Sequence, residues 1–305
     1  MNVQSQLIRC LVALLRIPPL SVAVSVGAAL GRLAFFVDRR HRKIALDNLR
    51  RALGDEALGD TALTRIARQA MMNLGRTAAE IAQWGGLDGE ELLRRVTIEG
   101  EDHLRAAQAL GRGVLCLTGH FGNWEWIGAV LALRGFPIHV VARALDDPSL
   151  NMILNTARTR HGNVVLDKRI AAGELVRLLR AGRSIGILVD QNTRVEDAIF
   201  VDYFGTPAAT HKGPAILALR TGAPVVPIFM VREGNRHRMT ISPALTLPHS
   251  GRLTDDLYQT TALFTKTIET AVRRHPDHWL WVHRRWKTRP KPKRDESSGI
   301  VDDVG

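Results

Sequence analysis

One short stretch of the chain combines a histidine and a carboxylate at a spacing suited to proton transfer. Residues 119–126 read GHFGNWEW, so four residues separate His120 from Glu125. A neutral imidazole can take a proton from an alcohol that attacks a carbonyl carbon, provided that its second ring nitrogen donates to a group that fixes the ring. An ionised Glu125 could be that group and would stabilise the imidazolium. The pair predicts His120 as a general base with Glu125 as its orienting acid. The alternative is a hydrogen-bonded turn histidine beside a solvated acid.

The surrounding residues predict that this pair lies at a turn between a buried strand and a helix. Residues 114–118 form an apolar run between two glycines, which indicates a strand, and residues 124–133 indicate a helix. Ligands bind at the carboxyl ends of strands in open α/β sheets, because backbone amides and helix N-termini converge there. We therefore expect Phe121, Gly122 and Asn123 to contact the substrate.

Polar residues follow two further predicted strands. Arg143 comes directly after the strand 136–142, where a guanidinium could bind a phosphate or a developing oxyanion. Asp190 and Gln191 end the strand 184–189 and place a carboxylate and an amide at the same sheet edge. The alternatives are a surface arginine and ordinary loop hydrogen bonds.

The chain resembles a known family: the lipid A late acyltransferases, the lauroyl and myristoyl transferases of Gram-negative envelopes, within the lysophospholipid acyltransferase superfamily. The resemblance covers nearly all of the chain up to about residue 289. It implies transfer of a fatty acyl group from an acyl carrier protein to a hydroxyl of a lipid A precursor, at the cytoplasmic face of the inner membrane. The HX4E spacing is shared by the superfamily, whereas the glycine and tryptophan context is more specific. The matching segments are 119–126, 190–191, 210–214, 225–227 and 279–286.

The resemblance also assigns Asp190 and Gln191 to the acceptor pocket. Thr210 and Lys212 precede a predicted helix at 215–219, where free backbone amides could bind a lipid phosphate or the phosphopantetheine arm of the carrier. The alternative for Thr210 is helix capping. One sequence does not distinguish acyl carrier protein from coenzyme A as donor, and another acceptor, such as a lysophospholipid, an ornithine lipid or a glycolipid, stays open.

Composition favours anionic partners. The 42 lysines and arginines exceed the 30 aspartates and glutamates, which gives a net charge of +12. The candidates are an anionic phospholipid surface, a phosphorylated lipid acceptor and an acidic carrier protein, with nucleic acid as a fourth. We expect no nucleic acid, and a membrane-associated nucleic-acid-binding protein is the remote alternative.

Cofactor chemistry has no sequence support. The chain has no Walker P-loop or H-E-x-x-H motif, and we expect no metal or other cofactor. Its two cysteines, Cys10 and Cys116, fit neither a disulfide framework nor a metal cluster, and both are expected to be buried thiols in a reducing compartment. We predict direct attack by the acceptor hydroxyl without an acyl-enzyme.

The N-terminus predicts a membrane anchor. Residues 11–37 are largely apolar, but the uninterrupted run 20–30 is too short to span a bilayer, which takes roughly 20 residues. The segment could span if its arginines snorkel, or lie in the interface. The basic cluster 39–43 fits retention on the cytoplasmic side. The alternative is a buried core helix.

The whole pattern predicts an α/β fold, with a mixed, largely parallel central sheet flanked by helices and an N-terminal membrane-anchoring helix. We divide the chain into an anchor (1–37), an acyltransferase domain (38–290) and a disordered tail (291–305). Trp279, Trp281 and Trp286 alternate with basic residues near the end of the domain. They suit a lipid–water interface or stacking on bases, and the alternative is burial in the core.

Overall fold

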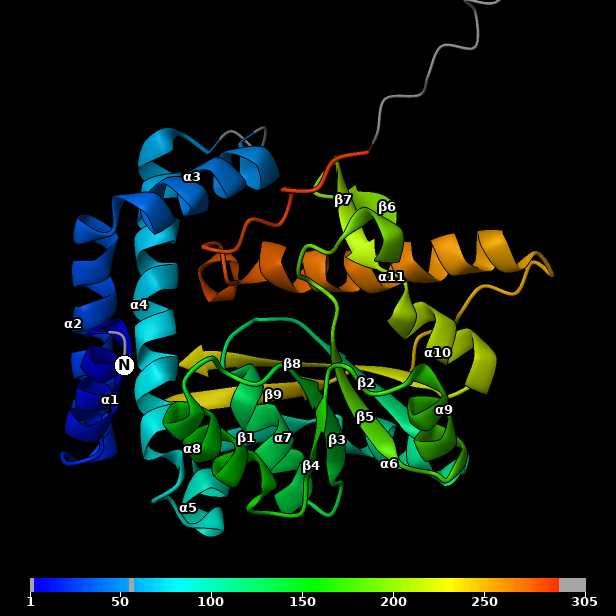
Figure 1. The fold of residues 1–305 in the computed structure, drawn as a ribbon, viewed down its shortest axis with the longest axis horizontal. Helices are drawn as coiled ribbons and strands as arrows, with labels where there is room; N and C mark the ends of the chain where they lie inside the picture. Colours follow the sequence, from blue (N-terminus) through cyan, green and yellow to red (C-terminus); the bar gives the residue numbers. More distant parts are fainter. Residues whose placement is uncertain (1–2, 55–57, 291–305) are drawn as a thin grey trace, which may run out of the picture.

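A seven-stranded sheet lies at the centre of the molecule (Figure 1). The computed structural model describes residues 3–54 and 58–290. Across the sheet the strand order is β1-β9-β8-β2-β5-β3-β4, and all neighbours are parallel except β8 and β9. The predicted α/β fold with a mixed, largely parallel sheet is confirmed. The strands are β1 (Val96–Glu99), β2 (Val114–Thr118), β3 (Ile138–Ala142), β4 (Val164–Asp167), β5 (Ser184–Leu188), β8 (Val225–Glu233) and β9 (Arg236–Ile241).

Helices cover both faces of the sheet, which explains why β2 is buried at every position and apolar at all but its last, Thr118. In β2, Val114 and Cys116 pack into one hydrophobic core, while Leu115 and Leu117 pack into the other. The first core is closed by α5 (Gly89–Arg94), α6 (Glu101–Ala109), α7 (Trp124–Leu133) and α8 (Pro148–Thr159). The second is closed by α9 (Ala172–Arg180), α10 (Gly213–Thr221) and α11 (Leu253–Arg274).

The strand register brings two distant loops together at one edge of the sheet. β2 and β5 are parallel neighbours, with Thr118 opposite Leu188. His120 follows β2 by two residues and Asp190 follows β5 by two residues. Parallel strands in this register therefore place the two side chains beside each other at the carboxyl edge, where such folds bind ligands.

The C-terminal segment packs against the turn that follows β2 at this edge. After α11 and the short 3₁₀ turn η2 (Pro276–His278), Trp279 forms an isolated antiparallel bridge with Phe121. Trp279, Trp281 and Trp286 are each at most 5% exposed. Of the alternatives that the sequence leaves open for them, burial in the core is the one that the structure shows. The three rings pack against one another and against the antiparallel hairpin of β6 (Ala198–Tyr203) and β7 (Thr206–His211), which shields them from solvent.

The N-terminal helices form a layer beside the sheet (Figure 1). This layer contains α1 (Val3–Leu15), α2 (Leu20–Val37), α3 (Arg39–Leu53) and α4 (Asp60–Trp84). α2 lies along α4, and the backbones approach closely because Gly27 faces Gly75: a Cβ on Gly27 would lie 2.3 Å from the Gly75 carbonyl oxygen. The predicted anchor is thus packed against the remainder of the chain.

The exposed side of α2 carries large apolar side chains. By length and composition α2 could cross a membrane, with a mean hydropathy of 1.9. Its exposed side chains Val22, Val26, Leu33, Phe36 and Val37 form a stripe along one side. Cys116 is buried as expected, but Cys10 is exposed because α1 turns it outward, so that prediction is wrong. The predicted disordered tail, 291–305, lies outside the described residues.

Candidate active site

His120 and Asp190 form the polar centre of the carboxyl edge. The Nδ1 atom of His120 lies 2.9 Å from Oδ1 of Asp190, and the backbone amide of His120 donates to Oδ2 at 2.7 Å. The indole Nε1 of Trp279 donates to the same Oδ2 at 2.8 Å. The side chains of His120 and Asp190 are 22% and 2% exposed. The carboxylate is thus buried with a hydrogen-bond partner at each oxygen, while one edge of the imidazole stays accessible to solvent.

Each member of this pair shifts the pKa of the other. Burial alone lowers the pKa of His120, but the neighbouring Asp190 charge and hydrogen bond outweigh it, so the pKa is raised above its ordinary value. Burial alone raises the pKa of Asp190, but His120 and Trp279 hold it at about 2. Because an ionised carboxylate only accepts, a neutral His120 carries its hydrogen on Nδ1. Its Nε2 lone pair is then available to accept a proton.

The orienting acid expected from the sequence is not the one that contacts His120. Glu125 instead accepts two hydrogen bonds from Arg158 of α8, at 2.8 and 2.5 Å. Glu125 lies in the first turn of α7, and that turn directs its carboxylate toward α8. The predicted hydrogen bond between Glu125 and His120 is therefore wrong, and Asp190 makes it. The charge of Glu125 still contributes to the raised pKa of His120.

Gln191 lies at the accessible edge of the imidazole. Its side-chain nitrogen is 3.1 Å from Nε2 of His120, so the amide group donates to the lone pair that a general base would use. Gln191 is exposed, whereas its neighbour Asp190 is buried. The structure thus brings both predicted residues to His120, one on each ring nitrogen.

The three turn residues after His120 have different environments. Phe121 is fully buried and packs against Phe229 and His278. Gly122 lines a pocket. Its backbone φ is +57°, and a Cβ on this residue would lie 1.7 Å from the Met230 carbonyl oxygen.

Asn123 is also fully buried, and it caps α7: its side-chain oxygen accepts from the Trp126 amide at 3.2 Å. Like Phe121, it holds the turn from inside the protein. Of the three predicted contacts, Gly122 is the one that lies along the pocket.

Three other predicted residues do not contact His120. Arg143 is 64% exposed and pairs with Asp146. Thr210 is buried in the β6–β7 hairpin, and Lys212 donates to the backbone oxygen of Glu196 at 2.8 Å. No contact in the structure tests their predicted roles in binding substrate.

Sequence reasoning missed two anchors of the site. Arg285 is fully buried, donates to the Ala209 backbone oxygen at 2.6 Å and to Thr210 Oγ1 at 2.5 Å, and so fixes the hairpin. The backbone oxygen of His278 accepts a hydrogen bond from the Gly122 amide at 2.8 Å and so holds the turn that carries His120. The WLWVHRRW run at 279–286 is recognisable in the sequence, but nothing local to it indicates that Trp279 pairs with Phe121 in the turn after His120.

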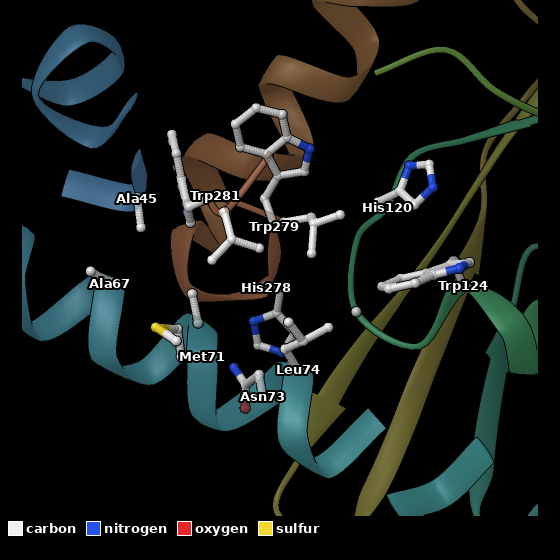
Figure 2. A pocket seen from close by; sticks show the side chains of 14 residues that line it. Ala45, Ala67, Met71, Asn73, Leu74, His120, Trp124, His278, Trp279 and Trp281 are labelled. Carbon is white, nitrogen blue, oxygen red and sulfur yellow. The ribbon is translucent and has the colours of Figure 1, made fainter. Parts of the chain in front are cut away.

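An apolar pocket lies between α4 and the turn that carries His120 (Figure 2). Its cavity volume is about 20 Å³, and the space between atoms around it, counted together with the open mouth, is about 370 Å³. His120 and Trp124 line one side, with Ala45, Ala67 and Met71 across from them. Its lining consists of Ala45, Ala67, Ala70, Met71, Asn73, Leu74, His120, Gly122, Trp124, His278, Trp279, Leu280, Trp281 and Val282. A general base at the end of an apolar pocket suits a substrate with a reactive head and a hydrocarbon tail.

Comparison with known proteins agrees with this chemistry. The chain is 27% identical to a lipid A biosynthesis lauroyltransferase of Escherichia coli (strain K12), over 90% of this chain and 88% of the relative. It is 26% identical to a lipid A biosynthesis myristoyltransferase of the same organism, over 86% and 80%. A phosphatidylinositol mannoside acyltransferase of Mycobacterium tuberculosis (strain CDC 1551 / Oshkosh) is 28% identical over 71% and 69%. Residues 5–288 match the model of the bacterial lipid A biosynthesis acyltransferases, so the chain belongs to that acyltransferase family.

Proposed function

We propose that this protein moves a fatty acyl chain from the thioester of an acyl carrier protein to a hydroxyl of a lipid A precursor, at the cytoplasmic face of the inner membrane. The observation that carries the proposal is the His120–Asp190 pair at the end of an apolar pocket, in a member of this family. The excess of basic residues suits the phosphorylated acceptor and the acidic carrier. Family membership favours this function over nucleic-acid binding.

In the proposed reaction His120 acts as the base. The acceptor oxygen attacks the thioester carbonyl carbon while its proton passes to Nε2 of His120. The tetrahedral intermediate then expels the carrier thiolate, which takes the proton back from His120 and leaves as a thiol. Asp190 stabilises the imidazolium between the two steps. The acceptor hydroxyl must replace Gln191 at Nε2, and we assign Gln191 to the acceptor side of the site for that reason.

Glu125 keeps a supporting role in this proposal. Its charge favours the imidazolium without a direct hydrogen bond, and its pairing with Arg158 fixes α8 against the first turn of α7. The predicted His/Glu dyad therefore becomes an electrostatic pair, with Asp190 as the contacting acid.

The pocket is expected to hold the acyl chain. Ala70→Leu adds bulk inside it and should lower kcat/KM for the longest accepted acyl donor relative to the shortest by about tenfold or more, because a methylene in an apolar pocket contributes about 1–3 kcal/mol. Steady-state kinetics with a series of donors measures this ratio. Ala52→Leu, a similarly buried alanine outside the pocket, is the control and should leave the ratio unchanged. Equal ratios in both variants would contradict this assignment.

The proposed function is tested by mass spectrometry of lipid acceptors. Detergent-solubilised protein is incubated with acyl-carrier-protein thioesters or matched acyl-coenzyme A, and with a tetra-acylated lipid A precursor, a phosphatidylinositol mannoside, a lysophospholipid or an ornithine lipid. We expect a mass gain of one acyl group on the lipid A precursor with the carrier-protein donor. Folded protein that acylates none of these acceptors would overturn the proposal.

The second candidate function is acylation of a different glycolipid. Relatives named phosphatidylinositol mannoside acyltransferases are about as similar to this chain as those named for lipid A, although over a shorter part of it. A mass gain confined to the phosphatidylinositol mannoside in the same experiment would select this candidate.

The apolar stripe on α2 is expected to contact the membrane. Its opposite side packs on α4, so the helix presents one face outward, which favours a position in the interface over spanning. Leu33→Glu/Phe36→Glu should lower partitioning into anionic phospholipid vesicles by about tenfold or more, because two large apolar side chains leave the lipid. Leu110→Glu/Leu253→Glu, two exposed leucines elsewhere, is the control. Equal loss from both double variants in vesicle sedimentation would contradict the proposal.

A further inference from the structure

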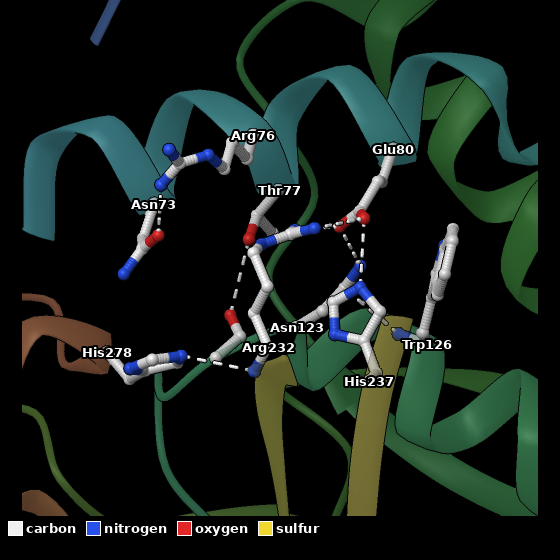
Figure 3. Close-up of polar contacts among 10 residues, drawn as sticks. Asn73, Arg76, Thr77, Glu80, Asn123, Trp126, Arg232, His237 and His278 are labelled. Atoms are coloured by element: carbon white, nitrogen blue, oxygen red, sulfur yellow. Dashed lines mark hydrogen bonds and ion pairs between the residues drawn. The ribbon is translucent and has the colours of Figure 1, made fainter. Parts of the chain in front are cut away.

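A buried carboxylate lies next to the catalytic turn without contacting His120. Glu80, on α4, is 2% exposed and faces β8, β9 and the start of α7 (Figure 3). Arg232 of β8 donates to both of its oxygens, at 2.8 and 2.5 Å. His237 of β9 lies 2.9 Å from Oε1 through its Nε2 atom, and Asn123 donates to Oε2 at 2.8 Å. One side chain thus joins four elements of the fold.

Glu80 is held in its charged form. Burial alone raises the pKa of this carboxyl, but the hydrogen bonds and charges of His237 and Arg232 outweigh burial and leave the pKa at about 2. Replacing a satisfied buried ion pair by apolar groups is often neutral for stability, whereas removing one partner is strongly destabilising. Stability alone is therefore a weak reason for a charged group here, and the contacts it makes are more informative.

These contacts converge on the turn that follows His120. The Asn123 side chain donates to Glu80 through Nδ2 and accepts the Trp126 amide through Oδ1, so Glu80 fixes the residue that caps α7. One turn earlier on α4, Thr77 donates to the Gly122 carbonyl oxygen at 3.4 Å.

A second set of contacts approaches the same turn from the β8 side. The backbone amide of Arg232 donates to His278 Nε2 at 3.1 Å, and the His278 carbonyl oxygen accepts from Gly122. Both sides of the turn are therefore connected to Glu80, through Asn123 and through Arg232.

The same helix also lines the pocket. Residues of α4 from Ala67 to Leu74 form one of its walls, while His120 and Gly122 lie on another. In the proposed reaction, the distance between the two walls sets how an acyl chain in the pocket approaches His120. A substitution far from the reacting atoms that misplaces them by about 1 Å can lower a rate by about 100-fold.

We propose that Glu80 is a positioning residue, which holds the His120 turn at a fixed distance from α4 through Asn123 and Arg232. This inference rests on the proposed function for its rate effect. Its structural part, the anchoring of the turn, is measurable without any substrate.

The test cuts the link and keeps the helix cap. Glu80→Gln leaves the buried positive charge of Arg232 without its partner, and this variant could fail to fold. Asn123→Ser is therefore the main variant, because serine is a good N-cap but is too short to donate to Glu80. Asn163→Ser is the matched control, because Asn163 is also buried and also makes one donor and one acceptor hydrogen bond, to Gly128 and Ile138.

Two readouts are compared in both variants. Asn123→Ser should lower kcat by about 10- to 100-fold, with each KM changed less than about threefold, because the groups that bind substrate remain. Amide hydrogen exchange in the peptide 119–126 should become at least about tenfold faster. Asn163→Ser should lose similar thermal stability, with kcat and the exchange of that peptide unchanged.

The outcomes are distinguishable. Equal losses of kcat in the two asparagine variants, or unchanged exchange of the turn in Asn123→Ser, would overturn the positioning role. If the wild-type protein transfers no acyl group while the exchange of the turn responds as expected, the proposed function fails and the anchoring by Glu80 stands.

Discussion

His120→Ala is expected to lower kcat/KM for acyl transfer by about two to four orders of magnitude. The substitution removes the Nε2 lone pair that accepts the proton of the attacking hydroxyl. Among the described side chains, the one that forms a hydrogen bond with Nε2 is the amide of Gln191. An amide does not act as a base at neutral pH, so little activity should remain. The rate is measured as the mass gain of the acceptor over time.

Folding is the necessary control for this variant. His249→Ala replaces an exposed histidine outside the site and should keep full activity. Circular dichroism should show both variants folded. Turnover in folded His120→Ala that equals that of the wild-type protein would exclude His120 as the base.

Asp190→Asn is expected to lower kcat/KM by about 10²- to 10³-fold, because it imposes the wrong histidine tautomer. The backbone amide of His120 and the Trp279 indole both donate to Oδ2 of Asp190. They would select the oxygen of the new amide, which leaves its NH₂ group facing Nδ1 of His120. Nδ1 must then accept, and the ring hydrogen moves to Nε2, where the base is needed.

The pH profile adds a second expectation for this variant. Loss of the Asp190 charge lowers the pKa of His120, which is raised in the wild-type protein. Activity of a base requires its neutral form, so the acid limb of the profile moves to lower pH while the maximal rate falls. Glu125→Gln should shift the limb less, since its charge acts from farther away. A larger loss in Glu125→Gln than in Asp190→Asn would contradict this assignment.

The location of the site could be predicted from the sequence for a local reason. The apolar run 114–118 ends in a glycine, and the residues after it switch to helical character, which is enough to place His120 at a strand-to-helix turn. The same reasoning places Asp190 at the end of β5.

The partner of His120 could not be predicted, because it depends on strand order. Asp190 reaches His120 only because β5 is the neighbour of β2 in register, although β3 and β4 lie between them in the chain. Glu125 lies only five positions after His120 in the sequence, so spacing alone favoured it as the partner. Arg158, from a helix 33 residues away, decides where that carboxylate points.

The tryptophans at the C-terminus show the same limit. Aromatic residues beside arginines look alike in sequence whether they face lipid or close a core. Their burial depends on the β6–β7 hairpin and on Arg285, which donates to the backbone of Ala209 across 76 residues. The residues around 279–286 do not by themselves predict that contact.

The most direct test of the central claim, that Asp190 holds the His120 imidazole for catalysis, is nuclear magnetic resonance of selectively labelled histidine in the detergent-solubilised protein. We expect a low-field Nδ1–H signal and a raised pKa for His120 in the wild-type protein, with both lost in Asp190→Asn and the signal kept in Glu125→Gln. A signal that persists in Asp190→Asn and disappears in Glu125→Gln would contradict the account.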